Sequence, residues 1–187
     1  RGPSFGGARR HANMHPMCGR YVVAYDPDTL ISGFSVVRVT PFPKRWNVAP
    51  MSAVPVVHDT REGERVATLM RWGLLPHWAK DIAFGRRTYN ARSETVAEKP
   101  SFRDAWRQGR RCIIPAEAVY EPNWESGKAV RWRVSRKDGR PMGLAGLWGW
   151  WRGPDGREWL SFTMLTINAD GHAVFGRLHR AGEEKRM

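Results

Sequence analysis

Cys18, in the segment Met17-Cys18-Gly19-Arg20, has the most distinctive chemistry of any residue in this 187-residue sequence. If processing makes Cys18 the first residue, its α-amine and its thiol lie on adjacent carbon atoms. Their reference pKa values are about 7.7–8.0 and about 8.5, so a useful fraction of each group is nucleophilic near neutral pH. With an aldehyde, the amine forms an imine and the thiol closes a thiazolidine ring, a step that proximity favours. A buried, inert cysteine is the alternative interpretation.

Three polar side chains follow one another at every second position in the segment "RTYNARSET", residues 87–95. On a β-strand, side chains at this spacing share one face, so Asn90, Arg92 and Glu94 are predicted to point the same way. An amide, a guanidinium and a carboxylate are costly to bury together unless they have a purpose. The spacing therefore favours a functional face.

Glu121 and His179 are candidates for proton transfer. Glu121 ends the hydrophobic run "AVYE", where partial burial would raise the pKa of its carboxyl group and suit it to acid–base chemistry. An ion pair with one of the 31 basic residues is the structural alternative. His179, in "GRLHR", titrates near neutral pH, although an isolated histidine is more often structural or solvated than catalytic.

The charge balance favours a polyanionic partner. Lys and Arg total 31 against 18 Asp and Glu, which gives a formal net charge of +13. Several of the 10 Trp residues adjoin basic residues, as in "KRWN", "RWRV" and "WGWWRG". Bases stack on aromatic rings while Arg and Lys hold phosphates, so this composition is typical of single-stranded nucleic-acid binding. A solvated basic surface and ordinary packing of tryptophan are the alternatives.

Other classes of protein fit the composition less well. The two cysteines, Cys18 and Cys112, suit a reducing cytoplasm, and the sequence has neither a CxxC nor an HExxH motif. We therefore expect no metal and no cofactor. No apolar run approaches the ~18 residues of a membrane span. A monomer located in the cytoplasm, in association with the nucleoid, is the expectation.

The pattern of residues predicts an α+β fold that is mainly antiparallel β. β-branched and aromatic runs dominate from Tyr21 onward, and "SRKDGRP" and "RGPDGRE" each carry the Asp-Gly pair of a hairpin turn. Two short helices are expected, in "DPDTLISGF" and in "KPSFRDAWRQG", the second with Ser101 as N-cap and Gly109 at its end. These elements predict a barrel-like or two-sheet core with a few short peripheral helices.

A series of motifs runs through the chain in a recognisable order. The motifs are "MCGRY", "RWNVAP", "RWGLLPHW", "YNARSET", "FRDAWRQGRRCIIPAEAVYEP", "GLAGLW", "LTINAD" and "RLH". This series resembles the SRAP family, the SOS-response-associated peptidase-like proteins that shield abasic sites in DNA. The resemblance extends from Met17 to the end of the chain.

The resemblance implies an activity and its residues. An N-terminal Cys18 would crosslink to the ring-opened sugar aldehyde of an abasic site in single-stranded DNA. Asn90 would position the N-terminus and the sugar, Glu121 would assist proton transfer, and His179 would protonate the sugar oxygen or assist reversal. The expected DNA contacts are phosphate binding by Arg20 and Arg92, base stacking by Trp78, and a loop near the site shaped by Asn47.

Two features depart from the family pattern. Pro122 stands where the family usually has Trp, which affects one side of the expected DNA cleft. The sequence also begins at Arg1, and an amide-bonded Cys18 cannot form a thiazolidine. Either residues 1–16 are a leader that Cys18 removes by autoproteolysis through an N→S shift, or Met17 is the true start and residues 1–16 are an appended or misplaced segment. We expect one domain over residues 17–187, in a natural chain that continues beyond Met187.

Three functions are compatible with these residues. The first is covalent capping of abasic sites, and the second is a cysteine peptidase that acts on its own leader or on other chains. The third is a non-catalytic binder of single strands, for which Cys18 would be dispensable. The charge and the Arg–Trp pattern favour DNA as substrate.

Overall fold

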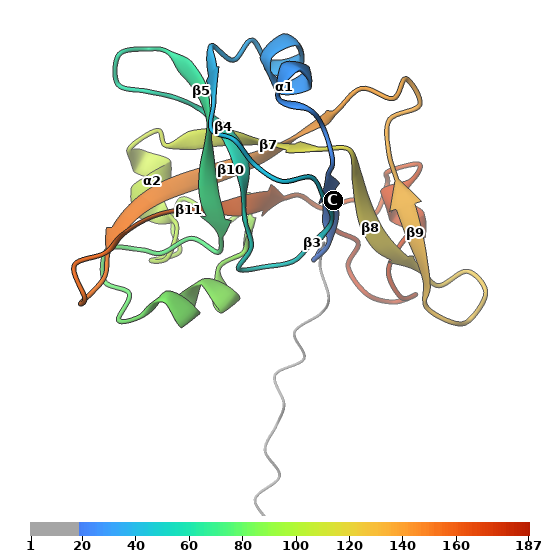
Figure 1. The fold of residues 1–187 in the computed structure, drawn as a ribbon. Coiled ribbons are helices and arrows are strands. Elements are labelled where there is room, and N and C mark those ends of the chain that lie inside the picture. Colours follow the sequence, from blue (N-terminus) through green and yellow to red (C-terminus); the bar gives the residue numbers. More distant parts are fainter. Residues whose placement is uncertain (1–18) are drawn as a thin grey trace, which may run out of the picture.

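The computed structural model describes residues 19–187, and it consists of a β-barrel with a smaller sheet packed beside it (Figure 1). In the described part of the chain, the strands form a seven-stranded sheet in the order β2-β5-β4-β7-β10-β11-β6 and a four-stranded sheet in the order β3-β1-β8-β9. The elements are β1 (Tyr21–Val23), α1 (Pro27–Phe34), β2 (Arg38–Val39), β3 (Arg45–Val48), β4 (Ala53–Asp59), β5 (Arg65–Trp72), the 3₁₀ helix η1 (Ile82–Arg87), β6 (Asn90–Arg92), α2 (Arg103–Arg107), β7 (Arg111–Ala116), β8 (Ala118–Asn123), β9 (Val130–Val134), β10 (Met142–Arg152), β11 (Glu158–Thr166) and the 3₁₀ helix η2 (Phe175–Arg177).

The larger sheet closes on itself. Strands β4, β5, β7, β10 and β11 are joined mainly by antiparallel pairs, and β11 then pairs in parallel with β5 at Ser161↔Arg71 and Phe162↔Trp72. Closure removes the open sheet edges that these strands would otherwise present. Alternate side chains fill the interior, among them Trp72, which stacks on Phe162 with ring centroids 6.3 Å apart.

The second sheet shares its core with the barrel. Tyr21, Val23, Val48 and Val119 of the smaller sheet belong to the same buried cluster as Ile114 of β7. The run "RCIIPAEAVYE" passes from one sheet to the other, because β7 ends at Ala116 and β8 begins at Ala118. The second half of this run, which forms β8, therefore belongs to the smaller sheet and includes Glu121.

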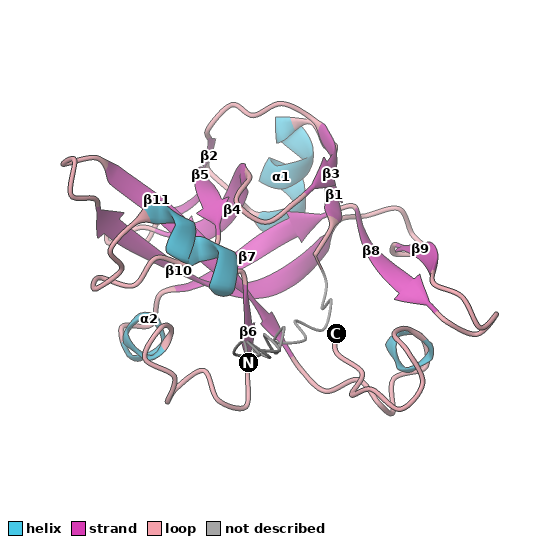
Figure 2. Cartoon of the chain, turned by 90° about the horizontal axis from the view of Figure 1, so that it is seen from below, coloured by secondary structure: helices cyan, strands magenta, loops and turns pink. Residues whose placement is uncertain are grey.

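Helices are few and peripheral in residues 19–187, as Figure 2 shows. Helix α1 begins with Pro27 and buries Leu30. Helix α2 begins after Phe102, so the prediction of Ser101 as N-cap was wrong. Phe102 packs against the buried cluster around Leu147, and this tertiary contact outweighs the capping preference of Ser101. None of the helices in the described part has the length and apolar character that a membrane span needs.

The two Asp-Gly pairs have different roles. Asp155-Gly156 lies between β10 and β11, which pair as the predicted hairpin. Asp138-Gly139 does not close a hairpin, because β9 pairs with β8 while β10 pairs with β7. Gly139 adopts φ 70° and Asp138 accepts a hydrogen bond from Arg136, so the local turn forms even though its flanking strands belong to different sheets. The predicted α+β fold with a barrel-like core is confirmed.

Candidate functional site

A pocket of about 440 Å³ opens in the smaller sheet, at the start of β1. Gly19 and Arg20 directly precede β1, and β1 pairs with β8 through Tyr21↔Val119. The antiparallel register brings the first described residues alongside the second half of β8, and the backbone N–H of Tyr120 donates to the Arg20 carbonyl at 2.9 Å. The lining residues are Gly19, Arg20, Tyr89, Tyr120, Glu121, Pro122, Trp124, Ala129 and Arg131.

Glu121 is the buried acid of this pocket. Strand alternation leaves Tyr120 and Pro122 partly exposed and turns Glu121 inward, where its exposed fraction is 1%. Its Oε2 lies 3.5 Å from Nε2 of His179, whose exposed fraction is 7%. The structure therefore brings together two of the predicted catalytic residues, and the burial of Glu121 is deeper than the partial burial predicted from the sequence.

His179 is held in place by backbone contacts. It has a positive φ of 65°, an uncommon conformation for a residue other than glycine. Its N–H donates to the Pro122 carbonyl at 2.7 Å, and its own carbonyl accepts from Nζ of Lys185 at 2.9 Å. Burial lowers the pKa of His179 below its ordinary value, and a hydrogen bond to the Arg186 backbone opposes this shift only in part. The imidazole is accordingly neutral near pH 7.

Asn90 begins the short strand β6, which pairs in parallel with β11 at Met164. Its side chain is partly buried, and the preceding residue, Tyr89, lines the pocket that contains Glu121. The Tyr89 carbonyl accepts a hydrogen bond from Nε1 of the buried Trp72 at 2.7 Å. The barrel core thus anchors the backbone next to Asn90.

Arg20 and Asn47 contact each other at the same end of the sheet. Nη1 of Arg20 donates to Oδ1 of Asn47 at 3.2 Å, and both side chains are exposed. Asn47 lies on strand β3, so the prediction that it shapes a loop was wrong. Pairing of β1 with β3 explains the position of Asn47, because the neighbouring Val48 stands opposite Tyr21.

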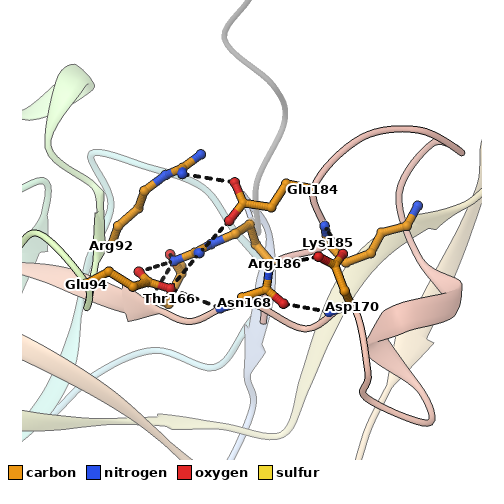
Figure 3. A network of polar contacts seen from close by, with 8 residues as sticks. All are labelled: Arg92, Glu94, Thr166, Asn168, Asp170, Glu184, Lys185 and Arg186. Atoms are coloured by element: carbon orange, nitrogen blue, oxygen red, sulfur yellow. Dashed lines mark hydrogen bonds and ion pairs between the residues drawn. The ribbon is translucent and has the colours of Figure 1, made fainter.

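Arg92 lies in a network of charged side chains (Figure 3). Its Nη1 is 2.9 Å from Oε2 of Glu184, and a second oxygen of Glu184 is 2.9 Å from Nη1 of Arg186. Arg186 is 3% exposed and also donates to both carboxylate oxygens of Glu94, at 2.8 and 2.9 Å. Glu94 follows the end of β6 in a turn, so the prediction that it lies on the same strand as Asn90 and Arg92 was wrong.

Trp78 lies at a different pocket. It is 43% exposed and makes an edge-on contact with Phe84, with ring centroids 4.9 Å apart. A pocket of about 350 Å³ adjoins it and is also lined by two cations, Lys80 and Arg87, and by one carboxylate, that of Asp81. Among the described residues, the two pockets have no lining residue in common. The structure thus places Trp78 on a separate basic and aromatic surface.

Several residues of the site were not predicted from the sequence. Trp124 and Arg131 line the Glu121 pocket, and the only signal for them was the general alternation of Trp and Arg. Glu184 and Arg186 were also missed, although the charged cluster "GEEKR" was a signal. Cys112 is buried and burial strongly raises the pKa of its thiol, which makes it unreactive.

Residues 19–187 contain no cluster of His, Cys, Asp and Glu side chains arranged to hold a metal ion. Cys18 lies outside the described residues, as do Met17 and the predicted leader of residues 1–16. Within the described residues, the candidate site therefore consists of the buried Glu121–His179 pair, the basic pocket around it, and the Arg92 network.

Comparison with known proteins identifies the family. Residues 17–182 match the model of the SOS response associated peptidase (SRAP) family. The chain belongs to the SRAP family. The abasic site processing protein YoqW of Bacillus subtilis is 34% identical over 154 residues, which cover 80% of this chain and 68% of that protein. The abasic site processing protein HMCES of Xenopus tropicalis is 29% identical over 152 residues, and the match covers 66% of this chain but 45% of that protein.

Solved structures agree with the SRAP fold. A crystal structure of a protein from Bordetella bronchiseptica has a TM-score of 0.80 and 39% sequence identity, covering 91% of this chain and 82% of that one. A protein from Bacteroides thetaiotaomicron has a TM-score of 0.74 at 21% identity, with coverage of 91% and 75%. The second similarity extends the same fold to a distant sequence.

Proposed function

We propose that this SRAP protein binds single-stranded DNA and shields abasic sites by a covalent thiazolidine crosslink to an N-terminal Cys18. One observation carries the proposal. Gly19, the residue directly after Cys18, lines the same pocket as Glu121, which is buried beside His179. The names of the SRAP relatives, abasic site processing proteins, agree with a substrate of this kind.

The proposed reaction is a condensation that releases one water molecule. The α-amine of Cys18 adds to the aldehyde carbon of the ring-opened sugar, and loss of the aldehyde oxygen as water leaves an imine. The thiol sulfur then adds to the imine carbon, and its proton passes to the nitrogen. Glu121 accepts the proton of the attacking amine and returns one to the departing oxygen. His179, neutral near pH 7, exchanges protons with the sugar oxygen during ring opening and reversal.

The remaining predicted residues position the reacting groups or bind the DNA. Asn90 orients the amine and the sugar from the start of β6. Arg20, on the rim of the pocket, and Arg92 bind flanking phosphates, while Asn47 holds the guanidinium of Arg20. Trp78 stacks on a base farther along the strand, since it lies at a separate pocket with Lys80 and Arg87.

A gel experiment tests the crosslink. Protein that begins with Cys18 is incubated with a single-stranded oligonucleotide carrying one abasic site, and the products are separated under denaturing conditions. A shifted band is expected that Cys18→Ala abolishes and Cys112→Ala preserves, because Cys112 is buried. An oligonucleotide with a tetrahydrofuran analogue, which has no aldehyde, should give no band. Salt-sensitive binding without any covalent product would instead favour a non-catalytic single-strand binder.

Autoproteolysis is a second candidate, favoured by the position of the Glu121–His179 pair next to Gly19. In this step the Cys18 sulfur attacks the Met17 carbonyl carbon, the amide C–N bond breaks, and the Cys18 nitrogen takes a proton. Water then hydrolyses the thioester and restores the thiol. Intact mass measurement of the 187-residue protein tests it. Loss of residues 1–17, blocked by Cys18→Ala and slowed by Glu121→Gln, is expected, and an unchanged mass would contradict it.

A further inference from the structure

Trp124 is an aromatic residue of the Glu121 pocket whose role the proposed reaction leaves open. It lies just past the end of β8, next to Pro122 in the pocket wall, and its side chain is partly buried. Pro122 offers no aromatic face at this wall. Tyr89 and Tyr120 also line the pocket, and Trp124 has the largest π surface among its described lining residues.

The backbone around Trp124 is fixed. Its carbonyl accepts from the N–H of Gly127 at 2.9 Å, and Gly127 has the positive φ of 77° that this turn requires. The side chain of the preceding Asn123 accepts from the N–H of Glu125 at 3.1 Å and donates to the Arg177 carbonyl at 3.2 Å. A ring on such a rigid turn loses little conformational entropy when a ligand stacks on it.

A cation already lies on the Trp124 ring. The guanidinium carbon of Arg180 is 5.7 Å from the ring centroid, and Arg180 is exposed. On the β9 side of the same pocket, Arg131 pairs in register with Pro122. Among the described lining residues the one carboxylate is that of Glu121, which is buried, so the accessible charges of the pocket are positive.

A π surface with one exposed cation over its ring and another cation in the same pocket wall matches a nucleobase with its phosphate. Bases stack on aromatic rings without regard to sequence, and guanidinium groups bind the backbone phosphates. We propose that Trp124 stacks on the base adjacent to the abasic sugar, with Arg180 supporting the ring and Arg131 binding the phosphate of that nucleotide. This assignment rests on the proposed function, because it takes the abasic sugar to lie beside Glu121.

Stacking is measurable without the crosslink. A single-stranded oligonucleotide with a tetrahydrofuran abasic analogue and 2-aminopurine as the neighbouring base has no aldehyde to react. Fluorescence quenching of 2-aminopurine reports stacking, and anisotropy reports affinity, with both the 187-residue protein and its Cys18-initiated form. Trp124→Leu should abolish the quenching and weaken binding roughly 5- to 100-fold, while Trp124→Phe should retain most of both.

Trp150 provides the matched control. Its side chain is 45% exposed, and the guanidinium carbon of Arg152 lies 5.8 Å from its ring centroid. Trp150 is on β10, however, and does not line this pocket. Trp150→Leu should leave quenching and affinity unchanged. Arg131→Gln should reduce the slope of log affinity against log salt by about 0.7, the value for one phosphate contact on a single strand. Circular dichroism and unfolding midpoints verify that each variant is folded.

The outcomes separate the two proposals. Absence of quenching with the unsubstituted protein, or quenching that survives in folded Trp124→Leu, overturns the stacking assignment. If Trp124→Leu is unfolded, folded Arg180→Gln decides, because it removes the cation from the ring and leaves Trp124 in place: unchanged quenching and affinity would overturn the assignment. Stacking with no crosslink to a natural abasic site would instead overturn the proposed reaction and leave this binding site in place.

Discussion

Nε2 of His179 lies 3.5 Å from Oε2 of Glu121, and both side chains are almost completely buried. The contact joins strand β8 to a segment near the end of the chain, which the Pro122 carbonyl holds through the His179 N–H. At this distance, a proton that either group takes up from a substrate can be passed to the other. The first two predictions follow from this pair.

Glu121→Gln keeps the size of the side chain but removes its ability to accept a proton. The rate of crosslinking to an abasic site should fall by about 10²- to 10⁴-fold, the usual contribution of a general acid or base. Affinity for the tetrahydrofuran oligonucleotide should change less than about twofold, because the arginines proposed to bind phosphates are untouched. Single-turnover gels and anisotropy measure the two quantities. Equal losses in both, in a folded variant, would contradict a chemical role.

His179 should make the protein less stable in weak acid. Its pKa is lowered in the folded state by burial, so the unfolded chain binds a proton first as the pH falls. Stability is therefore present above the ordinary pKa of about 6.5 and is lost as the pH falls from there through the lowered folded value, by at most about 1.4 kcal/mol per pH unit. Lys185 strengthens this shift, while Glu183 and the Arg186 backbone oppose it.

Asn is a suitable replacement at this position because it tolerates a positive φ. Urea unfolding of His179→Asn between pH 7.5 and pH 5 should show a smaller loss of stability than the unsubstituted protein. If the free energy of unfolding changed with pH in the same way for both proteins, the pKa of His179 would be the same in the folded and unfolded states, which would contradict this prediction.

Glu94→Gln should destabilise the fold through Arg186. The buried guanidinium would lose its bidentate carboxylate and keep Glu184 and the Thr166 carbonyl, at 2.9 and 2.7 Å. We expect a loss of about 1–3 kcal/mol in the free energy of unfolding, measured with urea at pH 7. Glu98→Gln, at an exposed position, is the control and should change it by less than about 0.5 kcal/mol.

Arg186 also lowers the pKa of Glu94 to about 2. The stabilisation from Glu94 is thus present above the ordinary carboxyl pKa of about 4.5 and is lost as the pH falls from there toward 2. The Glu94 side chain is about half exposed, so solvent screening reduces the size of this effect. The difference between the unsubstituted protein and Glu94→Gln should shrink over this pH range, and a constant difference would point to packing alone.

Glu184→Gln should increase affinity for single-stranded DNA. The carboxylate of Glu184 lies 2.9 Å from Arg92, and it would compete with a backbone phosphate for this guanidinium if Arg92 binds DNA as proposed. Without this competitor, affinity should rise by about two- to tenfold, and the salt dependence should steepen by about 0.7. Glu62→Gln, which makes the same charge change in the turn before β5, controls for net charge. An equal gain in both variants would mean that Arg92 does not bind the DNA.

Local patterns predicted the strands well because alternation and turn chemistry act over a few residues. The β-branched and aromatic runs after Tyr21 form strands as expected, among them β4, β5, β10 and β11, and Gly109 ends α2 with a φ of 66°. The failures have a common cause. Asp138-Gly139 forms a turn, but the strands on either side of it pair with other strands. Helix α2 begins after Phe102 and not after Ser101, because Phe102 packs against a buried cluster. In each case a contact with a distant segment decided the outcome.

The sequence alone indicated the family and the β-rich fold, because residue type and motif order carry this information. It also indicated the candidate catalytic residues, which are Cys18, Asn90, Glu121 and His179. Tertiary structure decided which of them meet. Only the register of β1 on β8 brings Gly19 beside Glu121, and only the backbone bond to Pro122 brings His179 to the same carboxylate. The parallel pairing of β6 with β11 likewise fixes the backbone of Arg92, whose side chain meets Glu184 from the end of the chain. Contacts of this kind depend on the packing of the whole domain, and no local pattern encodes them.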